Sequence, residues 1–153
     1  MRIVREIDIG APHARVWQLL SDDASRKLWM PDLIATTYPA GRPTGDPTGS
    51  TFRETMREGG SIRSFAGTVT AFVEGRMMAV RLQDHQLRME IDYRLNRNAN
   101  STGLRYSGEF QLVGVMGGMM IGMARPMIEG MVSRQLDSLK RVAEAKTDAR
   151  GDG

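Results

Sequence analysis

The hydrophobic period of this chain changes near Val113, and that change limits the folds open to it. Before this point apolar and polar residues alternate, most clearly in residues 87–95 and 104–112, which is the period of half-buried strands. After it, apolar residues recur at helical spacing through residues 128–143, with charged residues largely on the flanks and back. We therefore expect an α+β fold in which an antiparallel sheet precedes a long amphipathic C-terminal helix.

The start of the chain adds one strand and two short helices. Residues 2–9 alternate like a half-buried strand. Pro12 suits the first turn of a helix over residues 12–20. Residues 21–23 supply N-cap side chains for a second short helix, which Pro31 ends. Two short helices should thus separate the first strand from the others.

Strand patterns dominate residues 33–112, where turn-forming stretches separate them and indicate a run of antiparallel hairpins. Residues 41–49, rich in Pro, Gly and Thr, are typical of a mobile loop. Some strands alternate less regularly. In these strands we assign the following residues to shared apolar faces: Phe52, Met56, Phe65, Val69, Val73, Met78, Val80 and Leu82.

Composition limits the function classes. With 153 residues, 41% hydrophobic and 25% charged, the chain fits a single domain, which we place at residues 1–146 with a flexible tail at 147–153. It has no cysteine, which excludes disulfides and thiol chemistry. The net charge of +3 comes from dispersed arginines, so we expect no nucleic-acid partner. Charged residues at the N-terminus and the lack of an apolar signal segment predict a cytoplasmic protein.

Residues 113–124 are apolar and carry Gly114, Gly118 and Gly122 at GxxxG spacing. Arg125 interrupts this stretch well before the roughly 20 apolar residues that a membrane helix needs, so we expect no integral membrane span. The glycines fit either a flexible entry into the last helix or a close contact between helix and sheet.

Methionines crowd the same region. They are Met116, Met119, Met120, Met123, Met127 and Met131. Flexible thioether side chains suit a surface that repacks around different apolar shapes, although ordinary core filling explains them equally well. The neighbouring glycines favour the deformable wall of a cavity.

Few residues could carry chemistry. His13 and His85 lack metal-ligand spacing, and no nucleotide-binding fingerprint occurs, so we expect neither a metal nor a cofactor. Asp84 and His85 could form a base with its orienting carboxylate, but adjacent strand residues point to opposite faces, and the pair more naturally marks a turn. Glu54 shares the apolar face of its strand and is a candidate inward-facing carboxylate.

In this order, the elements resemble the START-like (SRPBCC) helix-grip superfamily, which includes polyketide cyclase and dehydrase-type proteins and the Bet v 1 allergens. The resemblance covers residues 2–146. The matching segments are residues 7–12, 16–22, 29–33, 49–52, 69–76 and 136–144 together with the two strands that end at Val113. It implies a curved antiparallel seven-stranded sheet that grips the C-terminal helix, with two short helices after strand 1 and an apolar cavity between sheet and helix.

The resemblance leaves function open, because some members act on polyketides and many only bind lipids or other apolar molecules. Our first hypothesis is the binding of one small apolar molecule, lipid or polyketide-like, by a monomer or homodimer. The expected lining is Phe52, Met56, Phe65, Val69, Val80, Met89, Ile91, Tyr93, Tyr106, Phe110, Met123, Met127 and Met131. Tyr93, Tyr106 and Glu54 are the available polar groups.

Two alternatives remain. The protein could be a polyketide cyclase, aromatase or dehydratase in which Glu54 or His85 moves a proton and a tyrosine orients a carbonyl. It could also be an interaction protein of the same fold whose cavity is filled by side chains.

Overall fold

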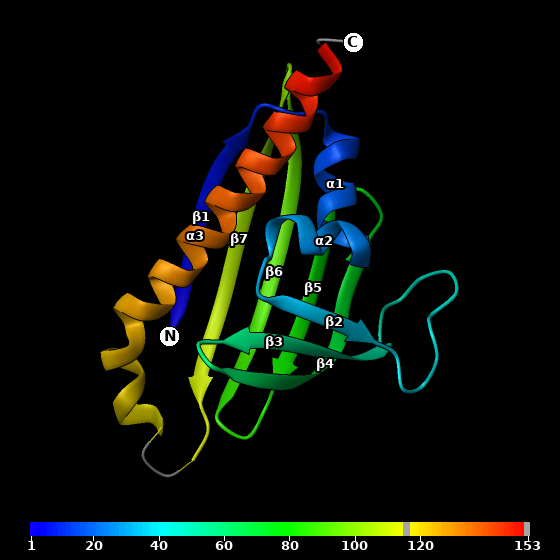
Figure 1. Cartoon of the computed structure of the whole chain (residues 1–153). Helices are drawn as coiled ribbons and strands as arrows, with labels where there is room; N and C mark the ends of the chain where they lie inside the picture. The colour runs from blue at the N-terminus through cyan, green and yellow to red at the C-terminus, as the bar shows by residue number, and fades with distance from the viewer. Residues whose placement is uncertain (115–116, 152–153) are drawn as a thin grey trace.

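A seven-stranded antiparallel sheet forms one layer of the fold, and helices lie against one of its faces (Figure 1). The computed structural model describes residues 1–114 and 117–151, and within them the side chains of residues 1–114 and 121–145. The strands are β1 (Arg2–Ile9), β2 (Leu33–Thr37), β3 (Thr51–Glu58), β4 (Ser61–Val73), β5 (Met77–Gln83), β6 (Leu87–Asn98) and β7 (Ser101–Leu112). The helices are α1 (His13–Ser21), α2 (Asp23–Trp29) and α3 (Gly117–Gly151).

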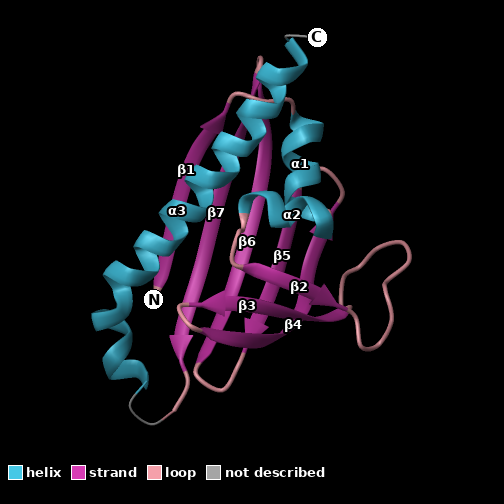
Figure 2. Ribbon diagram, viewed as in Figure 1, coloured by secondary structure: helices cyan, strands magenta, loops and turns pink. Residues whose placement is uncertain are grey.

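The strand order is β1-β7-β6-β5-β4-β3-β2, so every neighbouring pair except β1 and β7 is also consecutive in the chain. The two short helices occupy the connection that sends β2 to the far edge from β1. In Figure 2, β2 and β3 run across the direction of β6 and β7, which shows how strongly the sheet curves. The predicted helix-grip fold is confirmed.

The face of the sheet that the helices cover is called the inner face here. On β6 and β7 it carries the buried side chains of Met89, Tyr93, Leu95, Leu104, Tyr106 and Phe110, as the alternation predicts. On α3 the buried side chains are Ile128, Val132, Leu136, Leu139 and Ala143, which confirms the predicted stripe. α3 continues to Gly151, past the boundary expected at residue 146.

Local sequence signals also set where the two short helices begin. Pro12 stands at the N-cap of α1. The Asp22 side chain accepts a hydrogen bond from the backbone N–H of Ser25 at 2.9 Å and so caps α2. The cap fixes where α2 begins, and therefore which of its residues face the sheet.

The prediction that Val73 shares a face with Phe65 and Val69 is wrong. β4 contains a bulge between Val69 and Ala71, where its pairing with β5 shifts by one residue. A shift of one residue turns every later side chain to the other face. Phe72 consequently packs against the core, whereas Val73 is 46% exposed.

The glycine segment before and within α3 is described except for residues 115–116. A Cβ at Gly122 would meet no atom within 4 Å, so a close contact with the sheet does not explain that glycine. Among the described residues no helix is long and apolar enough to cross a membrane.

Candidate functional site

A buried ion pair lies on the inner face. Glu54 points inward from β3, where its neighbours on the same face are Phe52 and Met56, and its side chain is only 2% exposed. Arg26 of α2 donates a hydrogen bond from Nη2 to Oε1 of Glu54. Burying two charges costs solvation energy, which close pairing offsets only in part. The candidate inward carboxylate predicted from sequence is therefore inward and paired with a cation.

The charge of Arg26 is stabilised by its surroundings. Burial lowers the pKa of its guanidinium, but attraction to Glu54 and to Tyr93, together with the hydrogen bond from Arg26 to Glu54, outweighs this and raises the pKa overall. Nη2 of Arg26 also lies 3.9 Å from the sulfur of Met30. The guanidinium is thus a fixed cation between α2 and the sheet.

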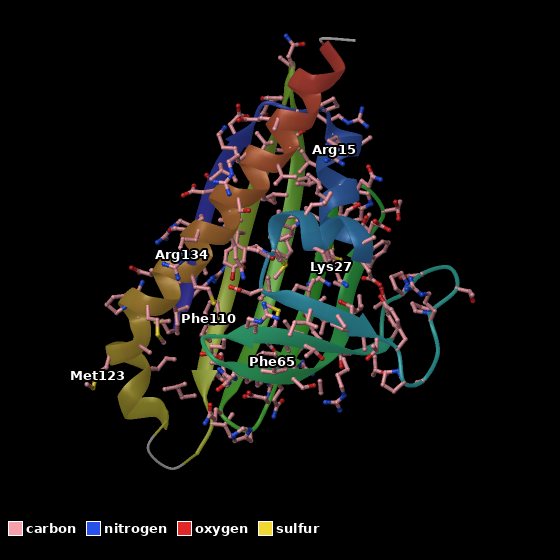
Figure 3. The ribbon with its side chains drawn as sticks, in the orientation of Figure 1. Arg15, Lys27, Phe65, Phe110, Met123 and Arg134 are labelled. Carbon is pink, nitrogen blue, oxygen red and sulfur yellow. The ribbon has the colours of Figure 1, made fainter. Side chains whose placement is uncertain are left out.

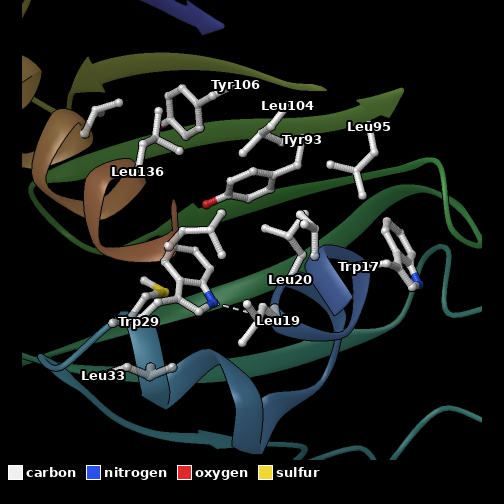
Figure 4. Packing of buried hydrophobic residues seen from close by; sticks show 14 of the residues in the cluster. Trp17, Leu19, Leu20, Trp29, Leu33, Tyr93, Leu95, Leu104, Tyr106 and Leu136 are labelled. Carbon is white, nitrogen blue, oxygen red and sulfur yellow. Dashed lines mark hydrogen bonds between the residues drawn. The ribbon is translucent and has the colours of Figure 1, made fainter. Parts of the chain in front are cut away.

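Tyr93 lies next to this pair, and the rings of Tyr106 and Trp29 pack around Tyr93 (Figure 4). Tyr93 and Tyr106 are register partners on β6 and β7, and their ring centroids lie 5.5 Å apart in an edge-on arrangement. Trp29 meets Tyr93 edge-on at 6.4 Å and donates a hydrogen bond from Nε1 to the carbonyl of Leu19 at 2.6 Å. These rings form an aromatic wall next to the ion pair.

Both tyrosine hydroxyls remain protonated near neutral pH. Burial raises the pKa of Tyr93 to about 12, with Arg26 opposing and Glu54 adding to the effect. Burial, helped by Tyr93, also raises the pKa of Tyr106 above its usual range. Neither hydroxyl hydrogen-bonds to another residue in the described part of the chain. Both are therefore free to donate to a ligand.

Two further polar atoms on the inner face lack partners. Oε2 of Glu54 and Oγ1 of Thr36 are buried and make no hydrogen bond with the described residues. Thr36 is the register partner of Glu54 across β2 and β3, so the two side chains stand next to each other on one face. Leaving a buried polar atom unpaired costs about 1–3 kcal/mol.

Most of the expected lining residues lie together on the inner face. Those that are buried are Phe52, Phe65, Val69, Met89, Tyr93, Tyr106 and Phe110. Those that are half-buried against the same cluster are Met56, Val80, Ile91 and Met131. Phe52 covers Gly67 of β4, where a Cβ would lie 2.3 Å from the ring. That they line a ligand site remains a prediction.

Met123 and Met127 do not join them. Their side chains are 80% and 67% exposed, and Figure 3 shows Met123 on the outer side of α3. Successive steps of four residues on an α-helix drift by about 40°, so residues 123, 127 and 131 turn gradually from solvent toward the sheet. Only Met131 packs against the core. Met116, Met119 and Met120 lie outside the residues whose side chains are described.

Two surface hollows, of about 390 and 550 Å³, lie on the opposite face of the sheet. The first is lined by residues such as Arg81, Glu90 and Asp92, and the second by Glu6 and Arg105 among others. Both are surrounded by charged groups. Neither hollow faces α3, where the resemblance places an apolar cavity.

His85 is exposed in the turn between β5 and β6, and it makes no contact with the Glu54–Arg26 pair that the described residues show. Oδ1 of Asp84 accepts hydrogen bonds from the backbone N–H groups of Gln86 and Leu87, each at 2.8 Å. Its Oδ2 accepts two from the Arg63 guanidinium, at 2.9 and 2.5 Å. Asp84 therefore builds the turn, and the turn interpretation of this pair is confirmed.

Replacing Asp84 with asparagine should lower the free energy of unfolding by about 1–2 kcal/mol at pH 7. Burial raises the pKa of the Asp84 carboxyl, but the hydrogen bonds from Gln86, Arg63 and Leu87 outweigh it, so the folded-state pKa lies below its usual range. The stabilisation is therefore complete above the unfolded pKa, about 3.9, and is lost as the pH falls through the folded value.

Urea denaturation of both proteins from pH 7 to pH 2.5 measures this. The difference between them should stay constant above about pH 5 and shrink below it. Asp137→Asn, on the exposed side of α3, is the control and should change stability by less than about 0.5 kcal/mol. A difference that persists unchanged in acid would contradict the role of the charge.

Comparison with known protein families shows which family the chain belongs to. Residues 1–144 match the family described as polyketide cyclase/dehydrase and lipid transport. The chain belongs to this family. A search of curated proteins finds no match.

Solved structures share the fold of this polyketide cyclase/dehydrase and lipid transport family member. The ZhuI aromatase/cyclase from Streptomyces sp. R1128 has 19% identity and a TM-score of 0.76, covering 99% of this chain and 98% of its own. A START superfamily protein from Mycobacterium smegmatis has 20% identity and a TM-score of 0.68, covering 94% and 97%. A protein from Thermus thermophilus has 15% identity and a TM-score of 0.74, covering 95% and 99%.

Sequence reasoning missed Arg26 and Thr36 in this family member. A signal for Arg26 existed, because it precedes the buried Trp29 by three residues and so shares its helix face. No local sequence signal pointed to Thr36, because the face to which its side chain points depends on a register shift between Leu33 and Ala35. Among the described residues no group of three or more His, Asp or Glu could hold a metal ion.

Proposed function

We propose that this protein binds a small apolar molecule with a polar group, against the inner face of the sheet between α2 and α3. The observation that carries the proposal is the Glu54–Arg26 pair, which stands with two undersatisfied tyrosine hydroxyls among apolar side chains. Ligand sites combine mostly apolar walls with a few placed polar groups. The family, described as including lipid transport, supports the same function.

The half-buried apolar side chains provide a surface from which a bound ligand would displace water. Met56, Val80, Ile91 and Met131 are apolar and only partly covered, in the same cluster as the buried core. Burying such surface under a ligand is favourable by about 25 cal/mol per Å². The cytoplasmic location and the monomeric or homodimeric state expected from sequence belong to this proposal.

Denaturing mass spectrometry of the purified protein should reveal a copurified apolar compound. A library of apolar compounds should also raise the melting temperature, because a ligand at 100 times its dissociation constant stabilises the folded state by about 2.7 kcal/mol. Val80→Gln, on the inner face, should weaken this stabilisation. Ala79→Gln, the neighbouring position on the outer face, is the matched control. Clean protein that gains no stability from the library would count against binding.

A polyketide cyclase or dehydratase activity is the second candidate. It is favoured by the position of Glu54, whose one unpaired oxygen could accept a proton close to the hydroxyl of Tyr93, which could donate to a carbonyl. The fold similarity to an aromatase/cyclase supports it. If turnover of a polyketide-like substrate is found, Glu54→Gln should abolish it and His85→Ala, in the exposed turn, should not.

A further inference from the structure

The strongest unexplained feature of the inner face is a pair of neighbouring residues that each carry an unpaired polar atom. Thr36 on β2 and Glu54 on β3 are register partners, so their side chains stand side by side. Oγ1 of Thr36 and Oε2 of Glu54 are both buried without a hydrogen-bond partner among the described residues. The Glu54 side chain is only 2% exposed. Such atoms are normally paired, so the two together mark a place for a polar group.

The hydrogen bond from Arg26 to Glu54 limits which ligand group fits there. Arg26 donates a hydrogen bond to Oε1, so Oε2 is the oxygen of the Glu54 carboxylate that is left to accept one. The ligand group that lies next to Oε2 must therefore donate a hydrogen bond. A ligand carboxylate has none to donate and would be repelled by Glu54.

Thr36 limits the group further. A threonine hydroxyl can donate a hydrogen bond as well as accept one. The ligand group next to Thr36 can therefore be an oxygen that accepts a hydrogen bond. One hydroxyl group satisfies both conditions at once, since it donates to Glu54 and accepts from Thr36. The aromatic rings of Tyr93 and Trp29 stand near the pair, and a flat apolar body fits beside them.

We infer that Thr36 and Glu54 form the polar end of the ligand site and select a neutral hydroxyl, phenolic or alcoholic, over a carboxylate. This inference rests on the proposed apolar binding at the inner face and specifies its ligand class. Arg26 acts as a positioning residue, because its hydrogen bond to Oε1 orients the Glu54 carboxylate.

Three probes of similar shape separate the inference from the proposed function. These are 2-naphthol, naphthalene and 2-naphthoate, whose binding can be measured by equilibrium dialysis. Naphthalene tests apolar binding alone. We expect 2-naphthol to bind roughly tenfold more tightly than naphthalene, as one buried hydrogen bond of about 1.4 kcal/mol would give, and 2-naphthoate to bind more weakly than either.

Thr36→Val tests the contact directly. It removes the hydroxyl at nearly constant volume and leaves the Arg26–Glu54 pair intact. Because Oγ1 of Thr36 has no protein partner among the described residues, the variant should fold as well as the wild type. It should reduce the preference for 2-naphthol over naphthalene by severalfold. Thr37→Val, the exposed neighbour on β2, is the matched control and should change neither this preference nor the binding of naphthalene.

The outcomes are distinct. Equal affinities for 2-naphthol and naphthalene, unaffected by Thr36→Val, would overturn the hydroxyl site and leave the proposed apolar binding intact; the two atoms would then hold water only. Tightest binding of 2-naphthoate would also overturn it and make Arg26 the anchor. Failure of all three probes to bind would overturn both the inference and the binding of apolar molecules of this size.

Discussion

Arg26→Met is expected to lower the free energy of unfolding by about 3–5 kcal/mol. The substitution keeps the aliphatic length of the side chain but removes the cation that faces Glu54. Glu54 then stays on the inner face with a side chain that is only 2% exposed and with no countercharge in its hydrogen-bonding shell. An uncompensated buried carboxylate is among the most destabilising changes that a single substitution can make. Urea denaturation measures the change.

A double variant separates the effect of the lost charge from the effect of the lost packing. Arg26→Met with Glu54→Gln removes both charges, and because a neutral amide is far cheaper to bury, the double variant should regain most of the lost stability. Arg125→Met is the matched control. Arg125 pairs with Glu129 on the exposed side of α3 at 2.8 Å, and its loss should cost less than about 0.5 kcal/mol. A double variant no more stable than Arg26→Met would assign the effect to packing.

Trp29→Ala is the second substitution with a large expected effect, about 3–5 kcal/mol. Trp29 is 1% exposed, and it fills the space between α2 and the sheet, where it meets Tyr93 edge-on. Its Nε1–H also satisfies the carbonyl of Leu19 on α1. The variant loses buried area, leaves a cavity and removes a contact that ties α1 to α2.

The neighbouring residue supplies the control for this change. Leu28 is 57% exposed on the same short helix, so Leu28→Ala should change stability by less than about 0.5 kcal/mol. Chemical denaturation of both variants gives the comparison, and the near-ultraviolet circular dichroism signal should fall in the first. Similar stabilities for the two variants would mean that α2 does not depend on its buried face.

The α2 site also shows where sequence reasoning reached its limit. Glu54 was expected to point inward from the alternation of its strand, and it does. Its partner is Arg26, 28 residues earlier in the chain, on an element whose distance from β3 no local pattern encodes. The aromatic wall beside it was predictable for Tyr93 and Tyr106, because their strands alternate cleanly. The contact of Trp29 with them was not.

Three features were determined by sequence alone because each depends on neighbours within a few residues. The alternation fixed the faces of β6 and β7, the Asp22 side chain fixed the start of α2, and the Asp84 carboxylate fixed the turn before β6. Hydrophobic period, capping and turn chemistry act over a single turn or pleat. A reader of the sequence has all the information that these interactions use.

Other features were decided by the tertiary structure. The bulge in β4 turned Val73 outward, the placement of α3 on the sheet left Met127 in solvent, and the pairing of β2 with β3 brought Thr36 beside Glu54. Each depends on the register or angle at which two elements meet. Those quantities follow from the packing of the whole inner face, because the free energy of each contact depends on all the side chains that share the core.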